Sequence, residues 1–157
     1  MSGEQTKNIG LGIGALLLQV IVFRHLDIWS IQPDLVLIFL VWLMGRKNRT
    51  VSLLMAGLLG IGQDFFLDLW GLNMFTKTLT VYLASRFVPQ SQKIRLSIGQ
   101  VSLTVLAVAV LHNLIFQGLN ISLLHYSGEA LFWRHLIGNS LYTALCASFI
   151  YLFRVQK

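Results

Sequence analysis

The sequence predicts an all-α integral membrane protein with six transmembrane helices. Hydrophobic residues make up 55% of the 157-residue chain and charged residues only 11%, with a mean hydropathy of +0.71. Soluble domains carry about 25% charged residues, so this composition is typical of a membrane protein. The apolar residues also fall into six runs separated by short polar segments, which predicts a single six-helix domain over residues 1–157.

The first two runs predict one ordinary helix and one short helix. Ile9–Phe23 has no small-residue cleavage site behind it, so we expect a retained helix rather than a signal peptide. Asp34–Met44 is shorter than the ~20 residues that cross a bilayer. We expect this second helix to be tilted, extended backwards through Leu26–Ile31, or partly re-entrant. Pro33 and Asp34 are typical of a helix start, because an acidic group stabilises the positive end of the helix dipole.

The four remaining runs are long enough to approach or exceed a bilayer crossing. They are Val51–Leu67, Leu72–Val88, Ile98–Leu119 and Leu131–Phe153. The loops between them are too short to hold a soluble domain.

The basic residues predict the orientation of the six helices. If the N-terminus is cytoplasmic, nine of the twelve Lys and Arg residues fall on the cytoplasmic side. The nine are Lys7, Arg46, Lys47, Arg49, Arg86, Lys93, Arg95, Arg154 and Lys157. Cytoplasmic loops carry an excess of Lys and Arg, so we predict that both termini are cytoplasmic. The net charge of +6 then reflects these loops beside membrane lipid, and no nucleic-acid partner is expected.

Polar side chains gather at the predicted outer ends of the last four helices. Asp64 and Asp68 lie near the end of the third helix, and their spacing of four places them on one helical face. The other members lie near the start of the fourth helix, the end of the fifth or the start of the sixth. The candidate polar cluster comprises Asp64, Asp68, Asn73, Lys77, His112, Asn113, Arg134 and His135.

Three interpretations of this polar cluster stay open. It could provide interfacial polarity and internal salt bridges, a docking surface for another membrane protein, or a pocket for a small polar ligand. Asp64 lies deeper in its helix than Asp68, and an ionised group costs more at greater depth. We therefore expect Asp64 to be the more important acid. We expect it to pair with Lys77 or Arg134, or to accept hydrogen bonds from Asn73.

The sequence lacks the motifs of the common enzyme classes. It contains no GxSxG, phosphate-binding loop or HExxH motif. A metal site would need His112 and His135, on different helices, to converge with Asp64 or Asp68, and we do not expect this. The single Cys146 excludes an intramolecular disulfide and a cysteine metal cluster. We therefore predict a protein that is not an enzyme and has no metal or cofactor.

A series of short motifs runs along the chain after the glycine-bearing first helix. They are Pro33-Asp34-Leu35-Val36-Leu37, Arg46-Lys47-Asn48-Arg49, Gly57-Leu58-Leu59-Gly60 followed by Asp64, Gly71-Leu72-Asn73, and Tyr82-Leu83-Ala84-Ser85-Arg86. This order resembles the rod shape-determining MreD family over nearly the whole chain, most sharply from Pro33 to Arg86. Either Asp64 or Asp68 can stand for the family's acid.

The MreD resemblance implies a non-catalytic membrane scaffold of the cell-elongation complex, in the bacterial cytoplasmic (inner) membrane. The implied partners are MreC, RodA with its penicillin-binding transpeptidase, and, indirectly, MreB; the implied process is peptidoglycan synthesis. The resemblance also implies a fold similar to the S components of vitamin transporters. That similarity supplies an alternative function, the binding of a small polar ligand in an outward-facing pocket. A shared fold does not by itself fix the function.

Overall fold

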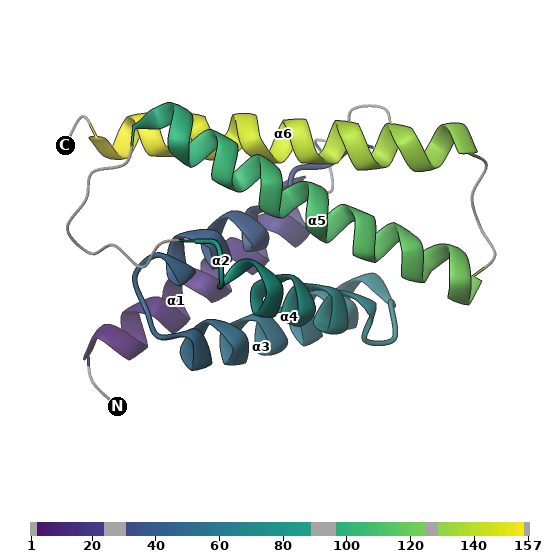
Figure 1. The fold of residues 1–157 in the computed structure, drawn as a ribbon. Coiled ribbons are helices and arrows are strands. Elements are labelled where there is room, and N and C mark those ends of the chain that lie inside the picture. The colour runs from purple at the N-terminus through teal and green to yellow at the C-terminus, as the bar shows by residue number, and fades with distance from the viewer. Residues whose placement is uncertain (1–2, 24–30, 89–96, 125–128, 156–157) are drawn as a thin grey trace.

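The computed structural model describes residues 3–23, 31–88, 97–124 and 129–155. Within these ranges the chain forms six α-helices and one π-helical turn (Figure 1). The elements are α1 (Gly3–Leu18), η1 (Gln19–Phe23), α2 (Leu35–Met44), α3 (Arg49–Leu67), α4 (Leu72–Ala84), α5 (Ile98–Leu124) and α6 (Glu129–Val155). The prediction of an all-α fold with six helices and a short second helix is confirmed.

The helices differ in their capacity to cross a membrane. Among the described residues, three helical segments are long and apolar enough to do so: Arg49–Leu67, Ile98–Ser122 and Leu131–Phe153. α2 has only 10 residues, which span about 15 Å, or half of a ~30 Å hydrocarbon core. The short α2 therefore needs other helices to shield its ends.

α4 is shorter than the sequence predicts. It has 13 residues and ends at Ala84 rather than at Val88. The Ser85 hydroxyl donates a hydrogen bond to the carbonyl of Tyr82 at 3.0 Å. Side-chain bonds of this kind compete with helix continuation, and the chain turns at this point.

α2 is the centre of the bundle. It contacts α1, α3, α4, α5 and α6, and Val36, Leu37, Leu40 and Leu43 on it are completely buried. The helices around it form two hairpins, α3–α4 and α5–α6, which meet where α4 contacts α5. Figure 1 shows both chain termini at the same end of the bundle.

The α3–α4 hairpin depends on a close approach at Gly60. A Cβ added there would lie 2.5 Å from the Cα of Met74, so only glycine lets the two backbones pack at this distance. The connecting turn needs unusual backbone angles as well. Asp68 adopts the left-handed conformation with φ 56°, and Gly71 has φ 88°, a value that glycine adopts at low cost.

Some of the sequence predictions concern residues that lie outside the described ranges. The expected backward extension of the second helix falls mostly on residues 24–30, which lie outside the described ranges. α2 itself begins only at Leu35, because Asp34 has an extended backbone with φ −100° and ψ 95°. The predicted loop residues Lys93, Arg95 and Lys157 also lie outside the described ranges.

Gly60→Ala should destabilise the folded protein in detergent. The new methyl group would overlap the backbone of α4, and overpacking of this kind costs about 1–3 kcal/mol. Gly57→Ala on the same helix is the control, because its Cβ would meet only the Thr78 hydroxyl at 3.7 Å, an ordinary contact. Alanine also favours helix over glycine, so the control should unfold at the wild-type temperature or higher. Equal unfolding temperatures for the two variants would contradict the close approach.

Candidate functional site

The start of α2 is built around the carboxylate of Asp34. Its Oδ1 accepts a hydrogen bond from the backbone N–H of Leu37 at 2.9 Å, which caps the helix as the sequence predicts. Its Oδ2 forms a salt bridge with the ammonium group of Lys77 on α4. Lys77 is completely buried and the side chain of Asp34 is 19% exposed. A single carboxylate thus caps one helix and neutralises a cation from another.

A histidine from α5 joins this ion pair. The Nε2 atom of His112 lies 3.6 Å from the same Oδ2 of Asp34, and His112 is buried. Because α2, α4 and α5 each contribute one side chain, the contact fixes the three helices relative to one another. Removing one member would leave a buried group without its partner, which is costly in the interior of a membrane protein.

The backbone before α2 is satisfied by side chains from two further elements. The Gln19 amide, in the π-helical turn after α1, donates to the carbonyl of Pro33 at 2.9 Å and accepts from the N–H of Leu35 at 2.7 Å. From α6, the Thr143 hydroxyl accepts from the N–H of Asp34 at 3.0 Å. Irregular backbone is tolerated at membrane depth only when its polar groups are bonded within the protein.

One more α6 side chain completes this arrangement. The Oδ1 atom of Asn139 accepts from the N–H of Gln32 at 3.1 Å. We use the term α2 junction for the backbone of residues 32–35 and the side chains that bind it or each other. These side chains are Gln19, Asp34, Lys77, His112, Asn139 and Thr143.

Asp64 serves the α3–α4 hairpin rather than the α2 junction. Its two carboxylate oxygens accept hydrogen bonds from the backbone N–H groups of Asn73 and Met74, both at 2.8 Å. These N–H groups belong to the first turn of α4, where an anion is stabilised by unpaired donors and by the helix dipole. Of the alternatives expected for Asp64, a hydrogen bond from Asn73 is present, through its backbone N–H, whereas Lys77 pairs with Asp34.

A third polar group joins α5 to α6. The Asn113 amide donates to the Ser140 hydroxyl at 3.0 Å, and the Gln117 amide nitrogen lies 3.1 Å from Nδ1 of His135. Hydrogen bonds of this kind hold transmembrane helices together, because lipid offers no competing partners.

The eight residues of the candidate polar cluster therefore separate by role. Lys77 and His112 belong to the α2 junction, Asp64 and Asn73 to the hairpin, and Asn113 and His135 to the α5–α6 contact. Asp68 and Arg134 are exposed. In the described part of the chain, no three His, Cys, Asp or Glu side chains come together as metal ligands.

Sequence reasoning assigned Asp34 only half of its role. It recognised the helix start, but it did not predict that the second carboxylate oxygen binds Lys77. A carboxylate that caps a helix with one oxygen can still bind a cation with its other oxygen. The predicted cap at Asp34 therefore already indicated that a cationic partner was possible. Gln19 offered another signal, since a lone amide inside an apolar run needs polar partners.

The three groups use most of their polar atoms internally, so their chemistry is chiefly structural. Some capacity for further hydrogen bonds remains. Within the described residues, Oε1 of Gln63, Nδ2 of Asn73 and Nδ1 of His112 are buried without a hydrogen-bond partner. These atoms can bind water or a small polar molecule.

Asp64→Asn should lower the unfolding temperature in detergent, whereas Asp68→Asn should not. Asparagine at position 64 keeps one acceptor but loses the second acceptor and the negative charge, at a cost of about 1–2 kcal/mol. Asparagine tolerates the left-handed backbone of Asp68, whose side chain is exposed, so this variant is the matched control. Thermal unfolding followed by tryptophan fluorescence measures both, and equal losses would contradict the capping role.

Comparisons with known proteins bear on the identity of the chain. The model of a protein family described as rod shape-determining protein MreD matches residues 9–155 of the 157. Searches of curated proteins and of solved structures gave no significant match. The family match covers the second part of α1, the whole of α2 to α6 and all three polar groups. It agrees with the resemblance found in the sequence motifs. The chain belongs to the MreD family of rod shape-determining proteins.

Proposed function

We propose that this protein is a non-catalytic membrane scaffold of the bacterial cell-elongation complex. Its membership of the MreD family gives it a role in rod-shape determination. In the proposed role it binds MreC and supports peptidoglycan synthesis by RodA and its penicillin-binding transpeptidase. MreB is an indirect partner on the cytoplasmic side.

The observation that carries the proposal is the family match, and the use of the buried polar groups supports it. Asp34, Lys77, Asp64 and Thr143 all bind other parts of the same chain. Polar side chains that bind other parts of the same chain hold the helices at fixed positions. A scaffold needs such fixed surfaces, because its partners must bind in defined relative positions.

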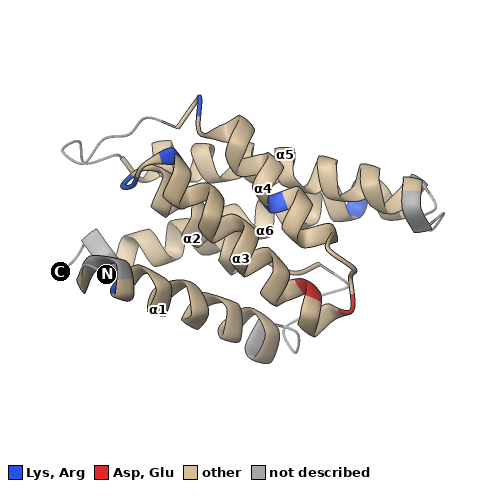
Figure 2. Ribbon diagram, turned by 90° about the horizontal axis from the view of Figure 1, so that it is seen from below, with Lys and Arg blue, Asp and Glu red and all other residues tan. Residues whose placement is uncertain are grey.

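We propose the cytoplasmic (inner) membrane as the location, with both termini in the cytoplasm. Figure 2 shows most of the described Lys and Arg residues at the end of the bundle that holds the two termini. The acidic positions visible in Figure 2 lie toward the other end. The excess of cations on cytoplasmic loops supports this orientation.

A second candidate function is that of an S component that binds a small polar molecule for a vitamin transporter. The buried unpartnered atoms of Gln63, Asn73 and His112 favour it, because a ligand could satisfy them. The scaffold is the stronger proposal, because the family match concerns cell shape.

Depletion of the protein should convert rod-shaped cells to round ones. The test uses a rod-shaped bacterium in which this chain is the only MreD, with wall synthesis followed by a fluorescent cell-wall label. Loss of the scaffold should delocalise the label before the cells widen. Re-expression of the wild-type chain or of Asp68→Asn should restore rods, because Asp68 lies outside the three polar groups.

Two outcomes would count against the scaffold. Cells that remain rods but lose uptake of a vitamin would favour the S component. A folded, tagged chain that purifies in mild detergent without MreC would contradict the proposed MreC contact.

A further inference from the structure

The turn between α3 and α4 presents an exposed tryptophan. The side chain of Trp70 is 98% exposed, and that of Phe65, in the last turn of α3, is 83% exposed. Both are large apolar side chains that the described residues leave largely uncovered. We use the term aromatic turn for residues 65–71, which end α3 and lead into α4.

The backbone of the aromatic turn holds Trp70 in an unusual conformation. Within the described residues, Asp68 and Trp70 are the two non-glycine residues with a positive φ, at 56° and 32°. A bulky residue rarely adopts such an angle, which favours glycine or asparagine. Two backbone bonds fix the turn: the N–H of Leu69 donates to the carbonyl of Asp64 at 3.2 Å, and the N–H of Leu72 donates to the carbonyl of Leu69 at 2.8 Å. The chain thus accepts an unfavourable backbone to place an indole outside its own packed core.

The length of α3 places the aromatic turn at the boundary of the hydrocarbon core. α3 is long and apolar enough to cross a membrane, and its 19 residues span about 28 Å of the ~30 Å hydrocarbon thickness. Its first residue, Arg49, is charged and belongs at one boundary, so Leu67 at its end lies near the other. Figure 1 shows the following turn at the end of the bundle away from both termini. Trp70 therefore lies at the level of the lipid headgroups.

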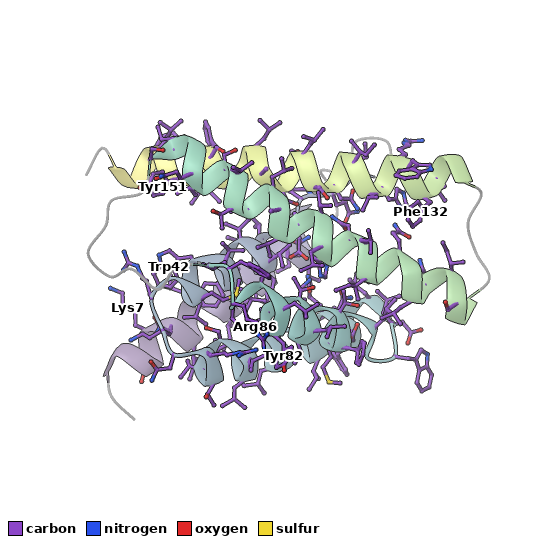
Figure 3. The ribbon with its side chains drawn as sticks, in the orientation of Figure 1. Lys7, Trp42, Tyr82, Arg86, Phe132 and Tyr151 are labelled. Atoms are coloured by element: carbon purple, nitrogen blue, oxygen red, sulfur yellow. The ribbon has the colours of Figure 1, made fainter. Side chains whose placement is uncertain are left out.

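A second tryptophan lies at the same end of the bundle. Trp133, near the start of α6, is exposed, and its ring packs edge to face against Phe132 with centroids 5.4 Å apart. Figure 3 places Phe132 at the end away from the termini, and Trp42 and Tyr151 in the half that holds them. Trp and Tyr concentrate at both membrane–water interfaces, because each joins an apolar ring to a polar N–H or O–H group. The two ends of this bundle show that pattern.

We propose that the aromatic turn inserts into the lipid headgroup layer of the leaflet opposite the chain termini, with the indole of Trp70 as its anchor. The ring contacts the upper part of the acyl chains, and the indole N–H donates to a lipid phosphate or ester oxygen. The aromatic turn contains Asp68 and no Lys or Arg, so the ring rather than a positive charge provides the attraction. The lipid is already present at this level, and the proposal does not depend on MreC or on any other protein partner.

The anchor would set the depth of the buried ion pair. α4 begins at Leu72, directly after the aromatic turn, and its 13 residues span about 20 Å, which is too short to cross the bilayer. Lys77 lies in the second turn of α4, about 8 Å along the helix axis from Leu72. A fixed level for the aromatic turn therefore fixes the level at which Lys77 meets Asp34.

Quenching of tryptophan fluorescence in reconstituted vesicles tests this proposal. The probe is a chain in which only Trp70 emits, because Trp29, Trp42 and Trp133 are replaced by Phe. The vesicles contain phosphatidylcholine with bromine atoms either near the headgroup end or near the methyl end of the acyl chains. Bromine near the headgroup should remove more of the emission than bromine near the methyl end. Iodide in the surrounding buffer should remove little.

The matched control reports the middle of the membrane. It carries Leu58→Trp and Trp70→Phe in the same background, because Leu58 is exposed and lies at the midpoint of α3. Its emission should show the reverse order, with the greater loss from bromine near the methyl end. The unfolding temperature verifies that each variant folds. If the triple replacement does not fold, the difference in emission between the wild type and Trp70→Phe supplies the same measurement, because the side chain at position 70 lies outside the packed core.

Three results would overturn the proposal. Trp70 emission that iodide quenches and bromine spares would place the aromatic turn in water, where a soluble partner could cover it. Stronger quenching by bromine near the methyl end would place the turn within the hydrocarbon. Protection from both quenchers that disappears when the protein is diluted in lipid would indicate a contact between copies of this chain.

Discussion

Asp34 and Lys77 meet inside the bundle, where Lys77 is completely buried and Asp34 is partly buried. Neither charge is tolerable there alone, and loss of one partner from a buried pair costs about 3–5 kcal/mol. The pair also sits at the start of α2, the helix that contacts the other five α-helices. α2 can therefore begin at half depth, with its first turn capped and its preceding backbone bonded to Gln19 and Thr143. This ion pair is the constraint on which the positions of the other helices depend.

The α3–α4 hairpin determines where Lys77 can reach. Gly60 lets α3 and α4 approach closely, and the carboxylate of Asp64 caps α4 one turn before Lys77. On the other side, Thr143 ties the α5–α6 hairpin to the backbone of Asp34. The two hairpins are thus fixed to one junction by different bonds. A protein built in this way can present stable surfaces to partners, which is what the proposed scaffold function requires.

The sequence was sufficient to predict the helices, but it was insufficient to predict the polar contacts between them. Apolar runs predicted six helices, and the Pro33-Asp34 pair predicted where α2 starts, because both signals are local. The salt bridge from Asp34 to Lys77 joins residues 43 positions apart, so it depends on packing that no local pattern contains. The expected polar cluster separates into groups for the same reason. His112 lies beside Asp34, but Asp64 does not bind Lys77, because its carboxylate accepts from the backbone N–H groups of Asn73 and Met74 and Lys77 binds Asp34.

A double-mutant cycle on the buried ion pair tests this account most directly. Asp34→Asn keeps a good capping side chain without the charge, and Lys77→Met keeps a long side chain without the ammonium group. The free energy of unfolding in detergent is measured for the wild type, both single variants and the double variant. The account predicts that each single variant loses about 3–5 kcal/mol and that the double variant loses clearly less than the sum. Strictly additive losses would mean that the two residues do not interact, and would contradict the central role of the pair.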